Sequence, residues 1–193
     1  DSSYYLGLSY VQLEQYDEAL VYLEEAIEKT DDFTQIYQSR MVVGYLYVAT
    51  KRYRLAEFEF QYLLDEGYES SKVYAALGYI CFKQGNVPAG IRNLEKAVTL
   101  DPENPTALNS LAFIMANEDI RIPVALSYIR RALTRKPQNP AYLDTLGWIL
   151  FKNGEYHKAR QILQKACELA PENIEIKMHY AKVEESIMTG KKP

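Results

Sequence analysis

The sequence is poor in the residues that most often carry chemistry. Its 193 residues include only two cysteines, two histidines and one tryptophan. Cys81 and Cys167 lack the spacing of a metal or redox pair and fall within apolar helical patterns, so we expect two buried free thiols. His157 and His179 have no metal-ligand spacing around them, and neither a glycine-rich phosphate loop nor a nucleophile elbow is present. The sequence therefore predicts no catalytic residue, no metal site and no cofactor.

Long apolar runs are also missing. No uninterrupted run reaches the roughly 18 residues that indicate a membrane-spanning helix, so we expect no direct membrane insertion. The first ten residues lack the basic and apolar parts of a signal peptide, which slightly favours the cytoplasm. The chain opens on Asp1 rather than on methionine, so we expect at least one further element, and room for a targeting segment, ahead of it in the native protein.

The charge pattern argues against a nucleic-acid partner. The net charge is −4, and residues 1–35 contain nine acidic residues against a single lysine. The densest basic stretches, Lys51–Arg54 and Arg130–Lys136, are expected to be solvated helix faces or helix ends, where cations are favourable. A mildly acidic chain without a concentrated basic stripe is a poor ligand for nucleic acid.

Small residues recur through the chain at intervals of 34 to 37 residues. The first in each interval follows a large apolar residue: Gly7, Gly44, Gly78, Ala112 and Gly147. A second follows twelve or thirteen positions later: Ala19, Ala56, Gly90, Ala125 and Ala159. Four positions further on, a large apolar residue appears each time: Leu23, Phe60, Leu94, Ile129 and Leu163. The last three intervals end in proline: Pro102, Pro137 and Pro171.

This spacing predicts pairs of helices packed closely together. Small residues at fixed points let two helices approach, and the large residues fill the remaining space. In the last three intervals proline falls just past the second helix, which it cannot continue. We expect Gly67, Gly85 and Gly154 to end helices in a left-handed conformation. We also expect Pro123 in the first turn of a helix, and Ser70 or Ser71 as an N-cap.

The pattern resembles the tetratricopeptide repeat (TPR), a helix–turn–helix unit of about 34 residues. The resemblance implies an all-α fold, a right-handed superhelical solenoid of about five TPR units plus a C-terminal capping helix. One array is expected to cover 1–193, with repeats at 1–33, 34–70, 71–104, 105–139 and 140–173 and a capping helix at 174–189. The chain departs from the family pattern because no repeat begins its motif with tryptophan and the first two lack the final proline.

The first helix of each repeat has two faces with different roles. When the small residue of its "LG"-type pair is counted as position 8, positions 4, 7, 8 and 11 meet the second helix. Positions 5, 9 and 12 are turned away, and the family resemblance places them in a concave groove. The predicted partner-binding residues are Tyr4, Leu8, Met41, Tyr45, Val48, Tyr79, Phe82, Asn109, Phe113, Asp144, Trp148 and Phe151.

An aromatic ladder of this kind is costly to leave in water, and two interpretations remain open. The rings either pack between neighbouring first helices or form a groove that accepts a peptide or an amphipathic helix of a partner. The Lys and Asn set with which family members hold chaperone carboxylates is incomplete here, since only Lys72 and Asn109 match it.

The sequence therefore predicts a non-catalytic scaffold for protein–protein interaction that binds a protein or peptide partner. Two alternatives stay open. In the first, the chain is a self-association or structural module of a larger protein. A homo-oligomer with Tyr45, Tyr79 or Phe113 in its interface is one form of this alternative. In the second, it is an accessory domain of an enzyme that is encoded elsewhere in the full chain. The identity of the partner is not readable from the sequence.

Overall fold

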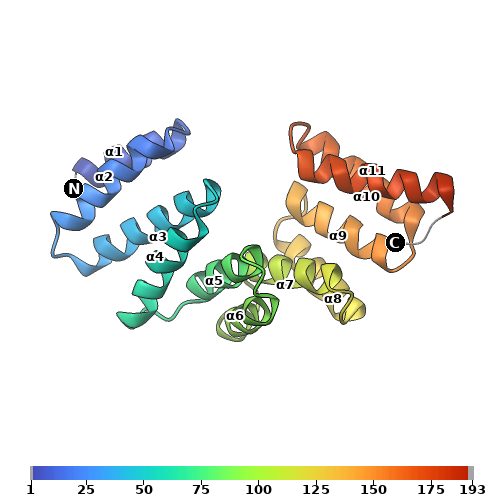
Figure 1. The fold of residues 1–193 in the computed structure, drawn as a ribbon, viewed down its shortest axis with the longest axis horizontal. Helices are drawn as coiled ribbons and strands as arrows, with labels where there is room; N and C mark the ends of the chain where they lie inside the picture. Colours follow the sequence, from blue (N-terminus) through green and yellow to red (C-terminus); the bar gives the residue numbers. More distant parts are fainter. Residues whose placement is uncertain (1, 191–193) are drawn as a thin grey trace. The chain divides into compact units, whose positions relative to one another are not determined.

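The computed structural model describes residues 2–190, and this part of the chain forms eleven α-helices without a strand (Figure 1). The fold is an all-α repeat solenoid. The helices are α1 (Ser2–Gln12), α2 (Tyr16–Glu28), α3 (Phe33–Ala49), α4 (Tyr53–Asp65), α5 (Ser71–Lys83), α6 (Val87–Leu100), α7 (Pro105–Asn117), α8 (Ile122–Arg135), α9 (Pro140–Lys152), α10 (Tyr156–Leu169) and α11 (Ile174–Thr189). None of these described helices combines the length and apolarity needed to cross a membrane.

Helix pairs are held at short range by the small residues of the repeat. A methyl group added at Gly44 would lie 2.8 Å from the ring of Phe60. One added at Gly147 would lie 2.5 Å from Cγ of Leu163, and Phe60 and Leu163 have no exposed surface. Each glycine therefore faces the large residue that the repeat spacing pairs with it. The predicted pairing of small and large residues is confirmed at these positions.

The turn inside each helix pair uses one backbone arrangement five times. The residue seven positions after the first small residue is left-handed in every pair, with φ between 53° and 84°: Glu14, Lys51, Gly85, Asp119 and Gly154. The backbone N–H of the following residue donates to the carbonyl five residues earlier, as from Arg52 to Tyr47. This hydrogen bond gives a partner to one of the free carbonyls at the C-terminal end of the helix. The glycine prediction is confirmed, and three non-glycine residues adopt the same conformation.

The other predicted helix signals are also confirmed. Ser70 is the N-cap of α5, and its hydroxyl accepts from the Val73 amide. Pro123 lies in the first turn of α8. The extra residue of this repeat is accommodated by a second left-handed residue, Arg121, directly before α8.

The chain divides into two compact units, residues 1–93 and residues 94–193, and the division falls inside α6. In unit 1, α2 contacts both α1 and α3, and α4 contacts both α3 and α5. Its core is built around buried side chains such as Leu23, Val43 and Phe60. That one continuous array covers the whole chain stays a prediction.

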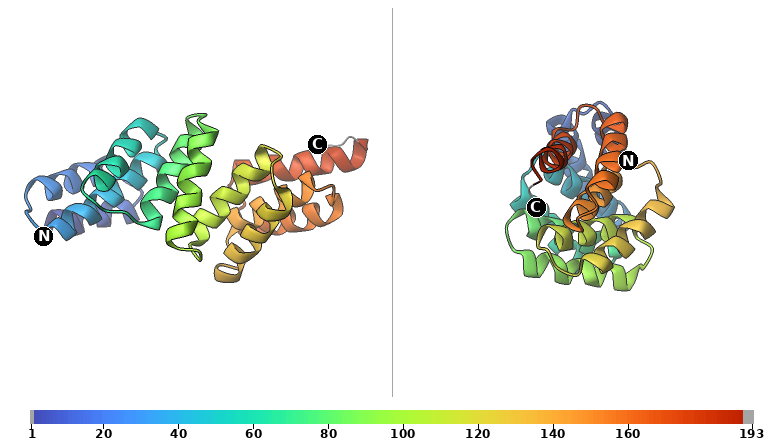
Figure 2. Two further views of the ribbon diagram at one scale, coloured as in Figure 1. Left: turned by 90° about the horizontal axis from the view of Figure 1, so that it is seen from below. Right: turned by 90° about the vertical axis from the view of Figure 1, so that its right-hand side faces the viewer.

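In unit 2, α9 contacts α7, α8, α10 and α11. The last two helices, α10 and α11, lie side by side in both views of Figure 2. Buried side chains from α9, α10 and α11 meet in one core, including Phe151, Leu163 and Val183. The first helices α7, α9 and α11 are therefore successive neighbours within this unit.

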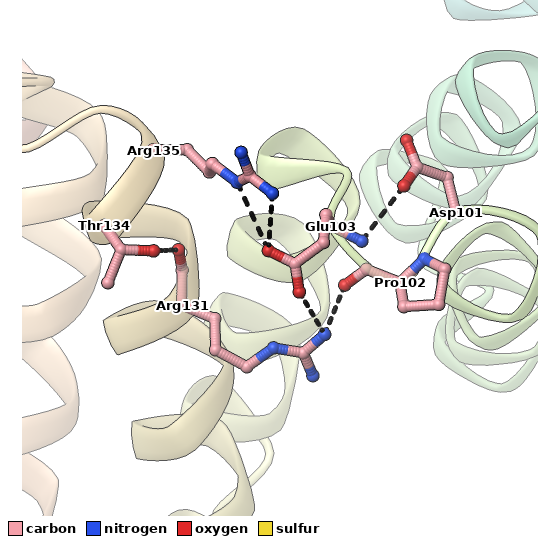
Figure 3. Close-up of polar contacts among 6 residues, drawn as sticks. All are labelled: Asp101, Pro102, Glu103, Arg131, Thr134 and Arg135. Atoms are coloured by element: carbon pink, nitrogen blue, oxygen red, sulfur yellow. Dashed lines mark hydrogen bonds and ion pairs between the residues drawn. The ribbon is translucent and has the colours of Figure 1, made fainter.

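Side-chain hydrogen bonds join α8 to the turn between α6 and α7 (Figure 3). The Glu103 carboxylate accepts from Arg131 at 3.1 Å and from Arg135 at 3.2 Å. Arg131 also donates to the Pro102 carbonyl. These hydrogen bonds to the two arginines hold the pKa of Glu103 below its usual value.

Both cysteines are free thiols, as predicted. Cys81 is buried, whereas Cys167 is only half-buried, so the prediction of burial was wrong in degree for the second thiol. Burial raises the pKa of each thiol, which disfavours the reactive thiolate.

Candidate partner-binding surface

In unit 1, the predicted site residues lie on α1, α3 and α5 with different exposures. Tyr4, Leu8 and Val48 are half-buried, and Met41 is buried. Tyr45 is 45% exposed, and its ring meets the edge of Phe60 with the centroids 5.3 Å apart. Tyr45 is thus an accessible aromatic ring of this unit.

On α5, Tyr79 and Phe82 are half-buried, and the Lys83 ammonium lies near both rings. The ammonium of Lys83 lies 5.3 Å from the centroid of the Tyr79 ring and 6.0 Å from that of Phe82. This arrangement permits a cation–π attraction that holds the lysine over the rings.

In unit 2, the predicted residues lie on α7 and α9. Asn109, Phe113 and Trp148 are half-buried, whereas Asp144 is 6% exposed and Phe151 is 1% exposed. Phe151 belongs to the core around Leu163 and Val183, and Met41 has the same status in the core of unit 1. These buried side chains support the surface from beneath. The binding role of the twelve residues stays a prediction.

Trp148 is held in place by contacts on several sides. Its indole N–H donates to the Asn117 side-chain oxygen at 2.8 Å. Its ring stacks on His179, with centroids 4.4 Å apart and an angle of 24° between the planes. Phe151 lies beneath it, at a centroid distance of 5.2 Å. The indole is therefore fixed in orientation and still reaches solvent.

His179 of α11 was not predicted as a site residue. Its Nδ1 lies 2.9 Å from each oxygen of the Asp144 carboxylate and donates to it, and the two side chains are only 15% and 8% exposed. A signal in the sequence existed, because Asn109, Asp144 and His179 follow one another at 35-residue steps. Counting position 5 once more, into the capping helix, would have found it.

Two further groups belong to the same surface. The Phe113 ring lies 6.3 Å from the His179 ring. The Asn109 side-chain oxygen is buried and has no hydrogen-bond partner among the described residues. We call the set formed by Asn109, Phe113, Asn117, Asp144, Trp148 and His179 the tryptophan surface.

The tryptophan surface carries little net charge. Helix α7 has no charged residue, α9 has only Asp144 and Lys152, and α11, which carries His179, has two lysines and three glutamates. Lys152 pairs with Asp119 at 3.0 Å, and its ammonium lies 5.8 Å from the Trp148 ring. The described part of the chain contains no group of three His, Cys, Asp or Glu residues that could hold a metal ion. The arrangement suits recognition of another molecule's side chains.

Solved structures of TPR proteins share this fold. YrrB, described as a TPR protein with an unusual peptide-binding site, matches over 93% of this chain and 90% of its own, at 21% identity and a TM-score of 0.60. A TPR protein of Thermus thermophilus matches over 95% and 98%, at 17% identity and 0.74. PilW, a type IV pilus biogenesis factor, matches over 96% and 84%, at 18% identity and 0.76. No curated protein sequence matches this chain significantly.

Family models agree with these structural likenesses. The tetratricopeptide repeat model matches residues 1–33 and 140–173, and a second TPR model matches residues 78–118. These segments together span more than half of the sequence and contain helix pairs described above. The chain therefore belongs to the tetratricopeptide-repeat family.

Proposed function

We propose that this chain binds a segment of a partner protein on the faces of its first helices, with the tryptophan surface as the main contact. Tetratricopeptide repeats are generally non-catalytic modules, and they support a role as a protein–protein interaction scaffold. The observation that carries the proposal is the state of Trp148, which is half-buried, stacked on His179 and hydrogen-bonded to Asn117.

A tryptophan in this state has the properties of a binding anchor. Its N–H already donates to Asn117, so an apolar group can cover the ring without leaving a buried donor unpaired. Its contacts with His179 and Phe151 fix the ring before a partner arrives, so little conformational entropy remains to be lost on binding. Fixed aromatic rings of this kind often contribute most of the binding energy at an interface.

Two observations support a peptide or helix as the ligand. YrrB, which has the same fold, is described as having a peptide-binding site. Unit 1 repeats the arrangement of half-exposed rings beside a lysine, with Tyr79, Phe82 and Lys83 on α5. Each unit therefore has its own surface of half-buried rings beside a lysine.

Panning random peptides against the whole chain tests the proposal. Recovered peptides are synthesised and titrated against the native protein and against Trp148→Ala. We expect Trp148→Ala to weaken binding by about 2 kcal/mol or more, roughly 30-fold, because the ring is the anchor. Acrylamide should quench the native indole emission, and a bound peptide should reduce that quenching.

Leu169→Ala is the matched control, because Leu169 is 42% exposed on α10, a second helix. It should leave peptide affinity unchanged. Peptides that bind Trp148→Ala as tightly as the native protein would exclude the tryptophan surface as their site. The self-association alternative predicts instead that the native chain sediments as a dimer, and that replacing Tyr45, Tyr79 or Phe113 by alanine shifts it to the monomer.

A further inference from the structure

One face of α11 is apolar and uncovered in the described chain. Ile174, Met178 and Met188 expose between 65% and 78% of their surface, and the exposed Ala181 lies between them. The opposite face of the helix carries Val183, which is buried in a core with side chains of α9 and α10. A helix face that stays in water is usually polar, because exposed apolar surface is costly.

The preceding repeat shows what this face of a first helix does elsewhere in the unit. In α9, the residues at positions 4, 7, 8 and 11 pack on the second helix α10, as Gly147 does on Leu163. The residues at the same positions of α11 are all exposed: Met178, Ala181, Lys182 and Glu185. Helix α11 therefore presents a helix-pairing face that no described helix covers.

The side chains of this face are arranged symmetrically about Ala181. Ile174 lies seven residues before it and Met188 seven residues after it. Lys177 lies four residues before it and Glu185 four residues after it. When two identical helices run antiparallel with Ala181 at the centre, residues at equal distances from that centre meet. Each isoleucine then meets a methionine, and each lysine meets a glutamate of opposite charge, so the face is complementary to itself.

Both charges are available for this pairing. Lys177 is exposed and forms no ion pair with another described residue. Glu185 lies 3.5 Å from Lys182, but both side chains are more than half exposed, and surface pairs of this kind contribute little. The small side chain of Ala181 at the centre lets two helices approach closely.

We propose that two copies of this chain associate through α11, in an antiparallel pair whose two-fold axis passes by Ala181. The pair covers the apolar side chains and joins Lys177 of each copy to Glu185 of the other. The dimer does not depend on the proposed function. His179 lies on a different face of α11, stacked on Trp148, so each copy keeps its tryptophan surface. A partner with two binding segments would engage such a dimer more tightly than a single chain.

Sedimentation equilibrium of the whole chain tests the proposal. One helix face is a small interface, so we expect a dimer with a dissociation constant of roughly 10–100 µM, and a monomer at low micromolar concentration. Met178→Asp places a charge in the contact and should keep the chain monomeric up to about five times that constant. Phe58→Asp is the matched control, because Phe58 is similarly exposed, on α4, and it should dimerise like the native chain.

Charge reversal tests the pairing within the dimer. Lys177→Glu and Glu185→Lys should each weaken dimerisation at least roughly tenfold, because like charges then meet across the two-fold axis. The two variants mixed together should form a heterodimer, since their faces carry opposite charges. The variant with both substitutions should dimerise like the native chain. Circular dichroism verifies that each variant is folded.

Each contrary result has a definite meaning. A native chain that stays monomeric throughout the concentration range would overturn the inference, and so would a dimer that persists in Met178→Asp. If such a dimer is lost in Tyr45→Ala instead, the interface lies on the first helices of unit 1. Mixed charge variants that remain monomeric would exclude the antiparallel pairing. These results leave peptide binding untouched, because that proposal fails only if Trp148→Ala keeps full affinity.

Discussion

Single residues set the distance between paired helices in this chain. Ala166 of α10 has no exposed surface and packs with Leu143 and Ile176 in the core of unit 2. Gly147 of the preceding helix contacts Leu163, one turn before Ala166. At such points the two backbones leave room for a methyl group and little more.

Ala166→Leu should therefore overpack α10 against its neighbours. We expect the free energy of unfolding to fall by about 1–3 kcal/mol, measured by urea denaturation. Ala181→Leu is the matched control, because Ala181 is exposed on α11, and it should change stability by less than about 0.5 kcal/mol. Equal stability of Ala166→Leu and the native protein would show that this position is not a close contact.

At the scale of the element, the five turns inside the helix pairs share one conformation but not one residue. Gly85 and Gly154 adopt it without a Cβ, whereas Glu14, Lys51 and Asp119 adopt it with one. A left-handed residue with a side chain is strained by roughly 1–2 kcal/mol. The pattern of hydrogen bonds is the same, so the repeat imposes the conformation on all five.

Lys51→Gly should stabilise the protein by about 0.5–1 kcal/mol. The substitution removes the strained Cβ, and this gain exceeds the entropy that glycine adds to the unfolded chain. Gly154→Ala, the reverse change at the equivalent turn, should cost about 1 kcal/mol. Thermal melting of both variants checks the pair, and a loss of stability in Lys51→Gly would contradict the idea of strain.

The hydrogen bonds between Glu103 and the arginines of α8 predict that the stability of the protein depends on pH. Arg131 and Arg135 lower the pKa of Glu103 in the folded chain, so the ionised form is favoured by folding. Its contribution is complete above the unfolded pKa, about 4.3, and is lost as the pH falls through the lower folded value. Native protein should therefore melt above Glu103→Gln at pH 7, and the two melting temperatures should converge below about pH 4. A gap that persists in stronger acid would point to another cause.

Much of the fold was predictable from the sequence, and the site only in part. The helix ends at Gly85 and Gly154 have a local cause, because glycine favours the required φ. Glu14 adopts the same conformation without such a local cause, because a Cβ disfavours the left-handed region. Trp148 was placed on a surface by its helical period, but its bond to Asn117 joins side chains 31 residues apart, and no local pattern encodes that.

At the scale of the whole chain, helices with neighbours on one side only should open first. Helix α1 contacts α2 within unit 1, whereas α9 contacts four helices of unit 2. The stability of a repeat depends on its interfaces with its neighbours. Hydrogen exchange should therefore be faster at the amides of α1 than at those of α9. Equal protection factors in both helices would contradict a stability that is built repeat by repeat.

The two free thiols lie one in each unit, and this gives the chain two separate chemical reporters. Cys81 is buried in unit 1 and accepts a hydrogen bond from the Asn93 side chain, while Cys167 is half-buried in unit 2. A thiol reagent reaches Cys167 after small local motions but reaches Cys81 only when helix α5 loosens from its surroundings. The order and spacing of the two modification events, followed by mass spectrometry under mild denaturant, would record whether the units loosen together or one after the other.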